Sequence, residues 1–478
     1  MAVSRSCPET PPTSSRSKLR IVADRGWHQH TEAVARLASS YAAIPAGETV
    51  RLAKRTTNLF RARAATTAPG LDVSGLDGVI EVLPDSPDGP VAEVQGMCTY
   101  EDLVDATLPH GLVPYVVPQL RTITLGGAVT GLGIESTSFR NGLPHESVLE
   151  MDVLTGAGEV VTCAPGGPHA DLFDAFPNSY GSLGYATRLR IRLEAVPPFV
   201  ALRHVPFPDA TAAAKALAEV AETGEWDGER VDGLDGTAFS PDHVVMTLAR
   251  FTDEPGPTSD YTGQQVYYRS VGERDRDRLT VHDYLWRWDT DWFWCSAAFG
   301  AQNPWARRVW PRRWRRSDVY HRLVRLDERV GLSRVLDRLK QVPGREKVVQ
   351  DVEVPVAALP DFLEWFDAEV GMRPVWLCPL RTTRPWPAYP LEAGDTYVNI
   401  GFWGTVVVPA DAPPGLVNRR IEEHVHTLGG HKSLYSEAFY DEATFRALYG
   451  VDALDAVRAT YDPRSRLTSL YEKAVSNA

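Results

Sequence analysis

The sequence predicts an α+β protein built from two regions, each mixing strands and helices. Its 478 residues exceed what a single hydrophobic core usually supports, so at least two domains are expected. Period-2 and period-3.6 apolar patterns both occur on either side of Val196-Pro197-Pro198. A long Trp- and Arg-rich stretch then interrupts the second region. We therefore divide the chain near residue 197 and treat residues 271–340 as an insertion.

The first region, residues 21–197, follows a leader, residues 1–20, whose Ser, Pro and Arg residues predict disorder. Thr99 and Asp102 form a capping pair at the start of a helix. The Thr-Gly-Ala-Gly run after Leu154 indicates a hairpin. The expected helices are residues 31–43 and 99–108, and the expected strands are residues 48–52, 78–82, 91–96, 148–154, 159–163 and 186–193.

The second region, residues 198–420, resembles a split βαβ pair wrapped around the insertion, which makes it a cap or substrate domain. A helical C-terminal segment, residues 421–478, is expected to return to the first region. The expected strands are residues 201–207, 244–250, 266–269, 347–354, 374–380 and 396–402, and the expected helices are residues 210–221 and 361–370.

Composition excludes several classes of function. The formal net charge of −12 argues against a nucleic acid as partner, because phosphate contacts call for a basic domain. Five cysteines without CxxC spacing predict neither a zinc site nor a disulfide framework, and His424, His426 and His431 are not spaced to share one helix face. No uncharged apolar run reaches the roughly 18 residues of a spanning helix. We expect a cytoplasmic protein, either free or peripheral at the inner face of the cell membrane, without a metal.

Glycines concentrate between Pro118 and Cys163, among small, hydroxylated and β-branched residues. Such a composition suits neither a regular helix nor a regular strand. Glycine permits close backbone approach or a positive φ, so the backbone here is expected to lie against a large group. A cofactor with a phosphate bridge fits that expectation.

The stretch from Trp286 to Arg316 holds seven of the thirteen tryptophans and seven arginines. Trp with Arg is typical of a surface that meets lipid headgroups. The same composition is expected of rings buried in a core or an oligomer contact and stacked with arginine. The sequence leaves both interpretations open.

The residues from Val116 to Thr162 resemble the FAD-binding domain of the vanillyl-alcohol oxidase (PCMH-type) flavoproteins. The runs VVPQLRTITLGGAVTGLGIESTSFRNGL, KVVQDVEVP and PVWLCP, and Leu434-Tyr435, are similar to runs in the Delta-24 sterol reductase branch, in the same order. GLGIESTSFRNGLPHESVLEMDVLTGAGEVV also resembles bacterial reductases that act with a methyltransferase to make 10-methyl branched fatty acids. The resemblance implies a two-subdomain PCMH-type FAD domain followed by an α+β cap.

The resemblance also implies which residues hold FAD. Residues 51–58 match the loop under the pyrophosphate but carry no histidine to attach the flavin, so FAD is expected to bind without a covalent link. The turn that contains Gly181, Gly184 and Tyr185 matches the last flavin contact, or it simply ends a helix before a strand. The expected FAD contacts are Lys54, Arg55, Thr56, Thr57, Asn58, Thr124, Gly126, Gly127, Gly131, Ser136, Thr137, Ser138, Gly142, Glu146, Gly181, Gly184 and Tyr185.

Reduction of an unactivated alkene needs a protein acid, because hydride does not add to an electron-rich double bond without a proton. Asp351 and Glu353 lie two apart on a predicted strand and so share a face. Both are also consistent with solvent-facing positions. For Tyr435 and Glu437, in the SLYSEAFY run, the alternative is a structural role that anchors the chain end by hydrogen bonds. The candidate acids are Glu353, with Asp351 beside it, Tyr435, Glu437 and His145.

The leading hypothesis is an FAD-dependent reductase that saturates the 10-methylene group of a phospholipid acyl chain. The resemblance implies NADPH as the electron donor, although no GxGxxG follows a strand in a separate nucleotide-binding unit. The expected partners are the lipid substrate, a membrane surface that meets Trp286–Arg316, and a lipid methyltransferase. The alternatives are a Delta-24 sterol-type reductase, an alcohol or sugar oxidase of the same superfamily, and a lipid-binding partner of a methyltransferase.

Overall fold

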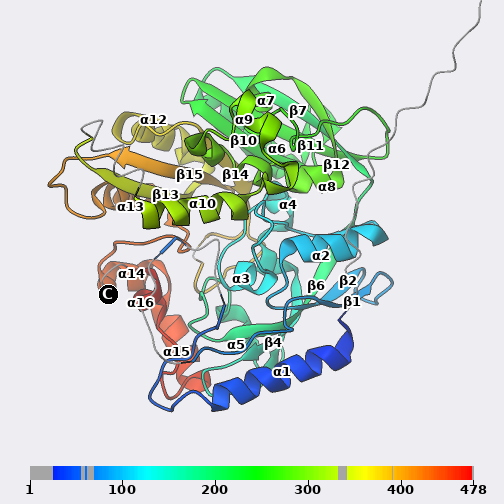
Figure 1. Cartoon of the computed structure of the whole chain (residues 1–478), viewed down its shortest axis with the longest axis vertical. Coiled ribbons are helices and arrows are strands. Elements are labelled where there is room, and N and C mark those ends of the chain that lie inside the picture. The colour runs from blue at the N-terminus through cyan, green and yellow to red at the C-terminus, as the bar shows by residue number, and fades with distance from the viewer. Residues whose placement is uncertain (1–24, 55–59, 62–68, 332–341, 390, 476–478) are drawn as a thin grey trace, which may run out of the picture.

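The chain folds into two halves, each built on one antiparallel sheet and stacked along the long axis of the molecule (Figure 1). The structure is a computed structural model that describes residues 25–54, 60–61, 69–331, 342–389 and 391–475. The predicted α+β fold is confirmed.

The lower half in Figure 1 contains a six-stranded sheet of order β1-β2-β6-β4-β5, with β3 paired to β6. β4 and β5 form the predicted hairpin, in which Met151 pairs with Cys163. Thr99 accepts a hydrogen bond from the backbone N–H of Asp102 and so caps α2 as expected. The strands are β1 (Val79–Leu83), β2 (Val91–Gln95), β3 (Leu112–Pro114), β4 (Val148–Leu154), β5 (Val160–Cys163) and β6 (Tyr185–Ala195).

The helices described before residue 197 accompany the strands of the lower half. α1 and α2 both contact β1, and α1 lies along the bottom of the molecule in Figure 1. Their bounds are α1 (Gly26–Ala42), α2 (Tyr100–Thr107), α3 (Leu125–Thr130), α4 (Ser138–Asn141) and α5 (Ala170–Ala175).

The upper half contains an eight-stranded sheet of order β12-β7-β11-β10-β14-β15-β13-β16. Its strands are β7 (Phe199–Phe207), β10 (Gly233–Ser240), β11 (His243–Thr252), β12 (Arg276–Thr280), β13 (Arg345–Pro355), β14 (Val375–Leu380), β15 (Tyr397–Val407) and β16 (His431–Lys432), and a separate two-stranded ribbon joins β8 (Glu225–Trp226) to β9 (Glu229–Arg230).

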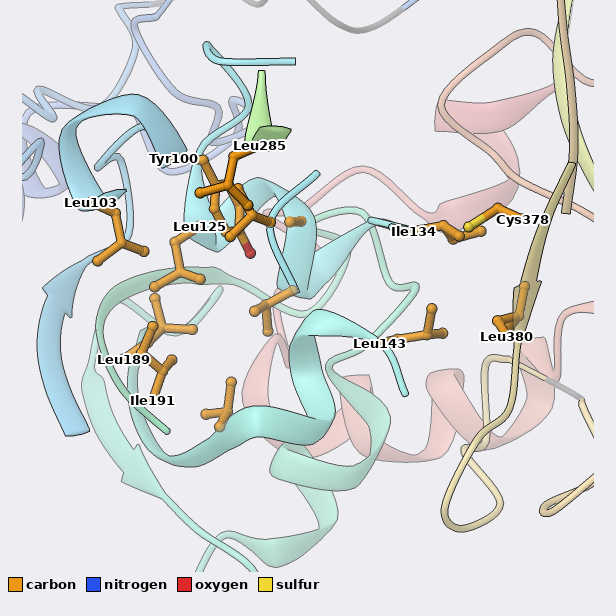
Figure 2. Packing of buried hydrophobic residues seen from close by; sticks show 14 of the residues in the cluster. Tyr100, Leu103, Leu125, Ile134, Leu143, Leu189, Ile191, Leu285, Cys378 and Leu380 are labelled. Atoms are coloured by element: carbon orange, nitrogen blue, oxygen red, sulfur yellow. The ribbon is translucent and has the colours of Figure 1, made fainter. Parts of the chain in front are cut away.

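The two faces of the upper sheet have different neighbours. Val348, Val352 and Ile400 pack in one core with apolar residues of the helices that contact this sheet. Cys378 and Leu380, on β14, belong instead to the core of the lower half, where Figure 2 shows them near Ile134 and Leu143. The covering helices are α6 (Ala210–Thr223), α12 (Leu359–Glu369) and α13 (Leu416–Thr427). One core therefore joins the halves, so residues from both sheets are held in fixed register at their junction.

The remaining helices lie in the middle and at the end of the chain. The C-terminal helices return to the lower half, where α15 contacts α5, and β16 pairs with β13 on the way. Their bounds are α7 (Tyr267–Glu273), α8 (Val281–Leu285), α9 (Pro304–Val309), α10 (Ser317–Val330), α14 (Glu442–Leu448), α15 (Val451–Tyr461) and α16 (Leu470–Ala474).

Two predicted strands are wrong. Residues 48–52 form no strand, because the Val50 N–H bonds to the carbonyl of Arg466 and Leu52 makes only an isolated bridge. Residues 266–269 enter helix α7, whose buried residues Tyr267, Ser270 and Val271 follow the 3.6-residue period rather than the period of a strand. β12, inside the predicted insertion 271–340, pairs with β7 at the edge of the upper sheet.

Candidate active site

A pocket with about 1580 Å³ of empty space, counted with its open mouth, lies where the two halves meet. Almost half of its described lining residues come from residues 118–134, within the predicted glycine segment. The upper half contributes residues of β13, β14 and β15. The pocket therefore depends on both sheets and on their fixed packing.

The glycine wall of the pocket is the short helix α3 and the turns around it. Thr124 caps α3 by accepting a hydrogen bond from the Gly127 N–H at 3.3 Å. A Cβ on Gly126 would stand 2.6 Å from the carbonyl oxygen of Gly96, so only glycine fits there. Gly127 instead is exposed at the pocket, and a Cβ on Gly131 would press on the Tyr180 ring at 3.1 Å. Gly126 and Gly131 therefore serve close packing around α3, and Gly127 leaves bare backbone at the cavity, where a phosphate-bearing ligand can approach it.

Two positively charged side chains lie beside this glycine wall. Lys54 Nζ lies 3.3 Å from Thr124 Oγ1 and 3.4 Å from Met97 Sδ, and all three residues line the pocket. Arg61 stacks over the ring of Tyr180, 4.9 Å from its centroid. A cofactor pyrophosphate would gain charge-assisted contacts from these two side chains. Residues 55–59, which hold the predicted contacts Arg55, Thr56, Thr57 and Asn58, lie outside the described residues.

Aromatic rings line another part of the pocket. Phe293 packs on Trp403 with ring centroids 4.3 Å apart and on Trp376 with centroids 5.5 Å apart. Trp292 and Phe293 have φ angles of 47° and 57°, in the left-handed region that bulky residues rarely adopt. Such strained backbone persists where the surrounding packing imposes it, and here it places both rings at the pocket. The result is an aromatic wall on this side of the pocket.

An acid pair interrupts this aromatic surface. Asp351 of β13 and Tyr435, which precedes α14, both line the pocket. Burial raises the pKa of Asp351 to about 7, although the neighbouring Asn399 and Tyr435 side chains lower it. Burial, and then the Asp351 charge, raise the pKa of Tyr435 well above its ordinary value, and Trp403 Nε1 donates a 2.9 Å hydrogen bond to its hydroxyl oxygen. At neutral pH this pair can carry a transferable proton within an apolar cavity.

Glu353 lies deeper on the same strand. It is fully buried, it accepts a 2.8 Å hydrogen bond from Ser433 Oγ, and it does not line the pocket. Burial raises the pKa of Glu353 well above its ordinary value. Neither Asp351 nor Glu353 has the fully solvent-facing position that the sequence left open.

Two further candidate acids are placed away from the pocket lining. Both ring nitrogens of His145 are buried without a hydrogen-bond partner, and burial, with a contribution from Arg384, lowers the pKa of this histidine to about 3. Its ring packs edge-on against Trp386 with centroids 4.4 Å apart. The carbonyl oxygen of Glu437 accepts a 2.6 Å hydrogen bond from Lys432 Nζ. Of the four catalytic residues predicted from the sequence, Glu353, Tyr435, Glu437 and His145, the structure therefore brings only Tyr435 to the cavity lining.

The predicted cofactor residues divide in the same way. Glu146 accepts hydrogen bonds from the Leu143 N–H and from Thr383. These bonds join the two halves, and Glu146 does not line the pocket. A Cβ on Gly184 would meet the carbonyl of Leu154 at 2.5 Å, so this glycine serves strand packing. At the pocket are Lys54, Thr124, Gly126, Gly127, Gly131, Gly181 and Tyr185, and away from its lining are Ser136, Thr137, Ser138, Gly142, Glu146 and Gly184.

Several pocket residues were not singled out from the sequence. Arg61 and Tyr180 carry no motif, and Tyr180 reaches the cavity through a backbone φ of 48°. Trp376 lies within the PVWLCP run, which therefore offered a signal. For Trp403, the sequence offered no signal beyond its place close to a predicted strand, which the structure shows as β15.

The Trp- and Arg-rich stretch divides into two parts. Trp286, Trp288 and Trp292 are buried, with at most 7% of their surface exposed. Trp305 and Trp314 are 74% and 46% exposed. The core interpretation therefore holds for the first third of the stretch, whereas Trp305 and Trp314 lie at the surface and the lipid interpretation stays a prediction.

Within the described ranges, no helix combines the length and apolar character needed to cross a membrane. No group of His, Cys, Asp and Glu side chains among those residues is arranged to hold a metal ion.

Comparison with known proteins defines the class. A family model described as an FAD binding domain matches residues 29–164, which include Lys54, Thr124 and the glycine wall. The bare backbone and the two cations at that wall fit such a cofactor. The chain is an FAD-dependent oxidoreductase with a PCMH-type FAD-binding domain.

Proteins with similar sequences show to which oxidoreductases this chain is related. The Delta(24)-sterol reductase of Rattus norvegicus is 24% identical over 377 residues, 75% of this chain and 69% of that protein. The Delta(24)-sterol reductase of Arabidopsis thaliana is 23% identical over 430 residues, 80% of this chain and 73% of that protein. Cytokinin dehydrogenase 6 of Oryza sativa subsp. japonica is 38% identical over 120 residues, 25% of this chain and 23% of that protein. The oxidoreductase is thus related to the Delta(24)-sterol reductases.

Proposed function

We propose that this FAD-dependent oxidoreductase saturates an isolated carbon–carbon double bond of a lipid, with the 10-methylene group of a phospholipid acyl chain as the substrate. The observation that carries the proposal is the acid pair Asp351–Tyr435 at the surface of an aromatic pocket that also contains the glycine wall. An oxidation of an alcohol needs a base at this position, whereas reduction of an alkene needs an acid that is protonated near neutral pH.

The reaction adds one hydride and one proton across the double bond. Bound FAD, once reduced, supplies the hydride and its two electrons. Asp351 holds the proton, and its pKa of about 7 leaves a substantial protonated fraction at physiological pH. Transfer of this proton to the CH₂ carbon breaks the π bond and leaves positive charge on the tertiary carbon, which accepts the hydride. The carboxylate formed on Asp351 is then reprotonated from solvent through the open mouth of the pocket.

Tyr435 positions the acid and holds a proton beside it. Its hydroxyl oxygen accepts from Trp403 Nε1, which leaves the hydroxyl proton free to point toward Asp351. The charge of Asp351 contributes to the raised pKa of Tyr435, so the two groups are electrostatically coupled. The pair is therefore best treated as one proton-donating unit.

The aromatic wall serves the positive charge that forms on the substrate. The faces of Phe293, Trp376 and Trp403 attract a cation electrostatically. Their bulk also excludes water, which would otherwise capture the tertiary cation as an alcohol. These two effects favour hydride capture over hydration.

The remaining parts of the proposal concern cofactor and partners. FAD is held without a covalent link, with Lys54 and Arg61 near its phosphates. NADPH is the proposed electron donor, since an enzyme that consumes a reduced flavin in each turnover needs a soluble reductant. A lipid methyltransferase is the proposed source of the 10-methylene substrate.

A sterol side-chain alkene is the second candidate substrate. The similarity to the Delta(24)-sterol reductases of Rattus norvegicus and Arabidopsis thaliana favours it, and its trisubstituted double bond would use the same acid and hydride.

One experiment tests the proposal. The purified chain is reconstituted with FAD, reduced with NADPH without oxygen, and mixed separately with a 10-methylene phospholipid and with a sterol that carries a Δ24 alkene. Conversion of the methylene lipid to the 10-methyl lipid supports the first assignment, and conversion of the sterol alone replaces it by the second. Rapid reoxidation by oxygen with release of peroxide, without reduction of either alkene, would contradict reductase function and favour an oxidase. A fourth outcome, in which lipid binds but Asp351→Asn leaves product formation by an added methyltransferase unchanged, would favour a binding partner.

A further inference from the structure

Exposed apolar side chains concentrate in one stretch of the chain. Among the described residues, nine large hydrophobic side chains are exposed, and six of them fall between residues 299 and 330. These six are Phe299, Trp305, Val309, Trp314, Leu326 and Val330. Single exposed apolar residues are ordinary on protein surfaces, so the concentration of six in one stretch calls for a reason.

Two buried arginines fix this stretch to the body of the protein. Arg307 pairs with Asp291 at 2.6 Å and donates to the carbonyls of Tyr261 and Gln265 at 2.9 and 2.8 Å. Arg315 donates to the carbonyl of Gly263 and to that of Arg307 itself. Five donors on a rigid guanidinium suit such anchoring. The backbone around α9 is therefore held in place, and its outward side chains are presented by a fixed support.

The outward side carries rings and positive charge together. Trp305 is 74% exposed and Val309 is 82% exposed, in successive turns of α9. Arg308 stacks over Trp305 at 5.3 Å, and Arg313 stacks over Trp314 at 5.8 Å. Cation–π stacking of this kind keeps each ring next to a guanidinium group.

The charge of this surface is one-sided. Between residues 299 and 330, each charged side chain that the structure describes as exposed is an arginine: Arg308, Arg312, Arg313, Arg322 and Arg329. Two of these arginines form ion pairs: Arg312 pairs with Asp260 of a neighbouring segment, and Arg322 pairs with Asp318. The chain as a whole has a formal net charge of −12, so the local excess of arginine opposes the overall balance. It suits an anionic partner.

We propose that residues 299–330 form the interfacial face of this protein, with which it docks on the surface of an anionic phospholipid bilayer. Trp305, Val309 and Trp314 enter the headgroup region, and Arg308 and Arg313 pair with lipid phosphates. Indole rings next to guanidinium groups match that boundary, where one side is apolar and the other carries phosphate. An acidic protein partner would use the same side chains, and the test below distinguishes it from a bilayer.

The interfacial face is linked to the pocket. Phe299 stacks on Tyr320 of α10 with centroids 6.3 Å apart, and the next residue, His321, packs on Trp292 at 4.3 Å. Trp292 lines the pocket. Docking would therefore bring a bilayer to a segment that packs against the pocket wall, which suits a substrate whose acyl chain starts in the membrane. The inference rests on the proposed function, because docking would deliver a lipid substrate. The docking itself can be measured without turnover.

The test is sedimentation of the FAD-loaded full chain with vesicles of phosphatidylcholine alone and of phosphatidylcholine mixed with phosphatidylglycerol. The parent is expected to bind the mixed vesicles and to lose binding as salt rises. Trp305→Ala/Val309→Ser is expected to lower the partition coefficient about ten-fold or more, from the apolar area withdrawn from the interface. Arg308→Gln/Arg313→Gln is expected to lower it about five-fold for each arginine, on anionic vesicles only.

Matched controls separate docking from general surface effects. Trp27→Ala/Val407→Ser removes the same residue types at positions 47% and 58% exposed outside this face, and Arg250→Gln/Arg464→Gln removes two exposed arginines elsewhere. Both controls are expected to bind as the parent does. Retention of FAD absorbance, and of reduction of a short detergent-dispersed alkene, shows that a variant is folded and that the chemistry is intact.

The proposal is overturned if the parent binds neither kind of vesicle, if it binds neutral and anionic vesicles equally, or if the interfacial variants bind as their controls do. Failure to bind vesicles together with capture by a purified methyltransferase would assign the face to a protein partner instead. Failure of alkene reduction with vesicle binding intact would count against the proposed function alone.

Discussion

Replacement of Asp351 by asparagine should remove the proton that alkene reduction needs while leaving the flavin reducible. Asparagine keeps the size and polarity of the side chain, and about half of Asp351 is already uncharged near pH 7, where its pKa lies. The fold should therefore tolerate the change. Proton donation by a positioned side chain contributes about a hundred- to ten-thousand-fold to a rate, so the alkene step should slow by that range.

The pH dependence follows from the same pKa. Only the protonated form of Asp351 can donate, so in the parent enzyme the rate should be level below pH 7 and should fall about ten-fold per unit above it. In Asp351→Asn this fall should disappear, and a small residual rate should remain from Tyr435. The rate of flavin reduction by NADPH should change little, since that step takes no proton from Asp351.

The assay is stopped-flow reoxidation of the reduced flavin by the 10-methylene lipid without oxygen, from pH 5 to pH 9, with product mass measured at the end. Asp411→Asn, in an exposed loop, is the control for loss of a carboxyl group. Glu353→Gln distinguishes the two acids of the strand, because the loss of rate should follow the residue that donates. Unchanged reoxidation with an unchanged pH profile in Asp351→Asn would refute the reasoning, and a loss found in Glu353→Gln alone would move the role to the deeper carboxyl.

Three other predictions concern cofactor affinity and stability. Lys54→Met should weaken FAD binding about ten- to a hundred-fold in a fluorescence titration, since a charged hydrogen bond contributes about 1.5–3 kcal/mol, whereas Lys215→Met at an exposed position of α6 should not. Arg287→Leu should lower the free energy of unfolding by about 3–5 kcal/mol in urea, because it leaves two buried carboxyl groups without their cation; a loss no larger than that of exposed Arg276→Gln would contradict this. The pKa of His145 is lowered to about 3 in the fold, so its unfolded form binds the proton first, and stability should fall by about 1.4 kcal/mol per unit as pH drops below about 6.5. In His145→Phe that slope should be shallower, and an equal slope would show that other groups set it.

Local patterns in the sequence predicted much of the FAD half. Strand alternation fixed β6, and the Thr99 and Asp102 pair capped α2 as expected, because both signals depend on neighbours within a few residues. The glycine wall was also visible, since bare backbone has no other residue type to supply it. Residues 48–52 could not be placed, because the backbone partner of Val50 lies more than four hundred residues along the chain.

The sequence predicted only part of the site formed by Asp351 and Tyr435. Alternation placed Asp351 and Glu353 on one face of a strand, but no local pattern shows where the pocket ends along that strand. The difference arises from distant neighbours: Ser433 covers Glu353, whereas Tyr435 and Trp403 lie at the cavity. Packing likewise decided which tryptophans of the Trp- and Arg-rich stretch are core and which are surface.

The central claim is that the reduced enzyme transfers hydride and proton to an isolated lipid alkene. The most direct measurement reduces the FAD-loaded chain without oxygen, adds the 10-methylene phospholipid in deuterated water, and analyses the product by mass spectrometry. The account predicts that flavin oxidation matches the 10-methyl lipid formed and that one deuterium enters at the former CH₂ carbon. Persistence of the methylene lipid beside a fully reduced flavin would contradict it.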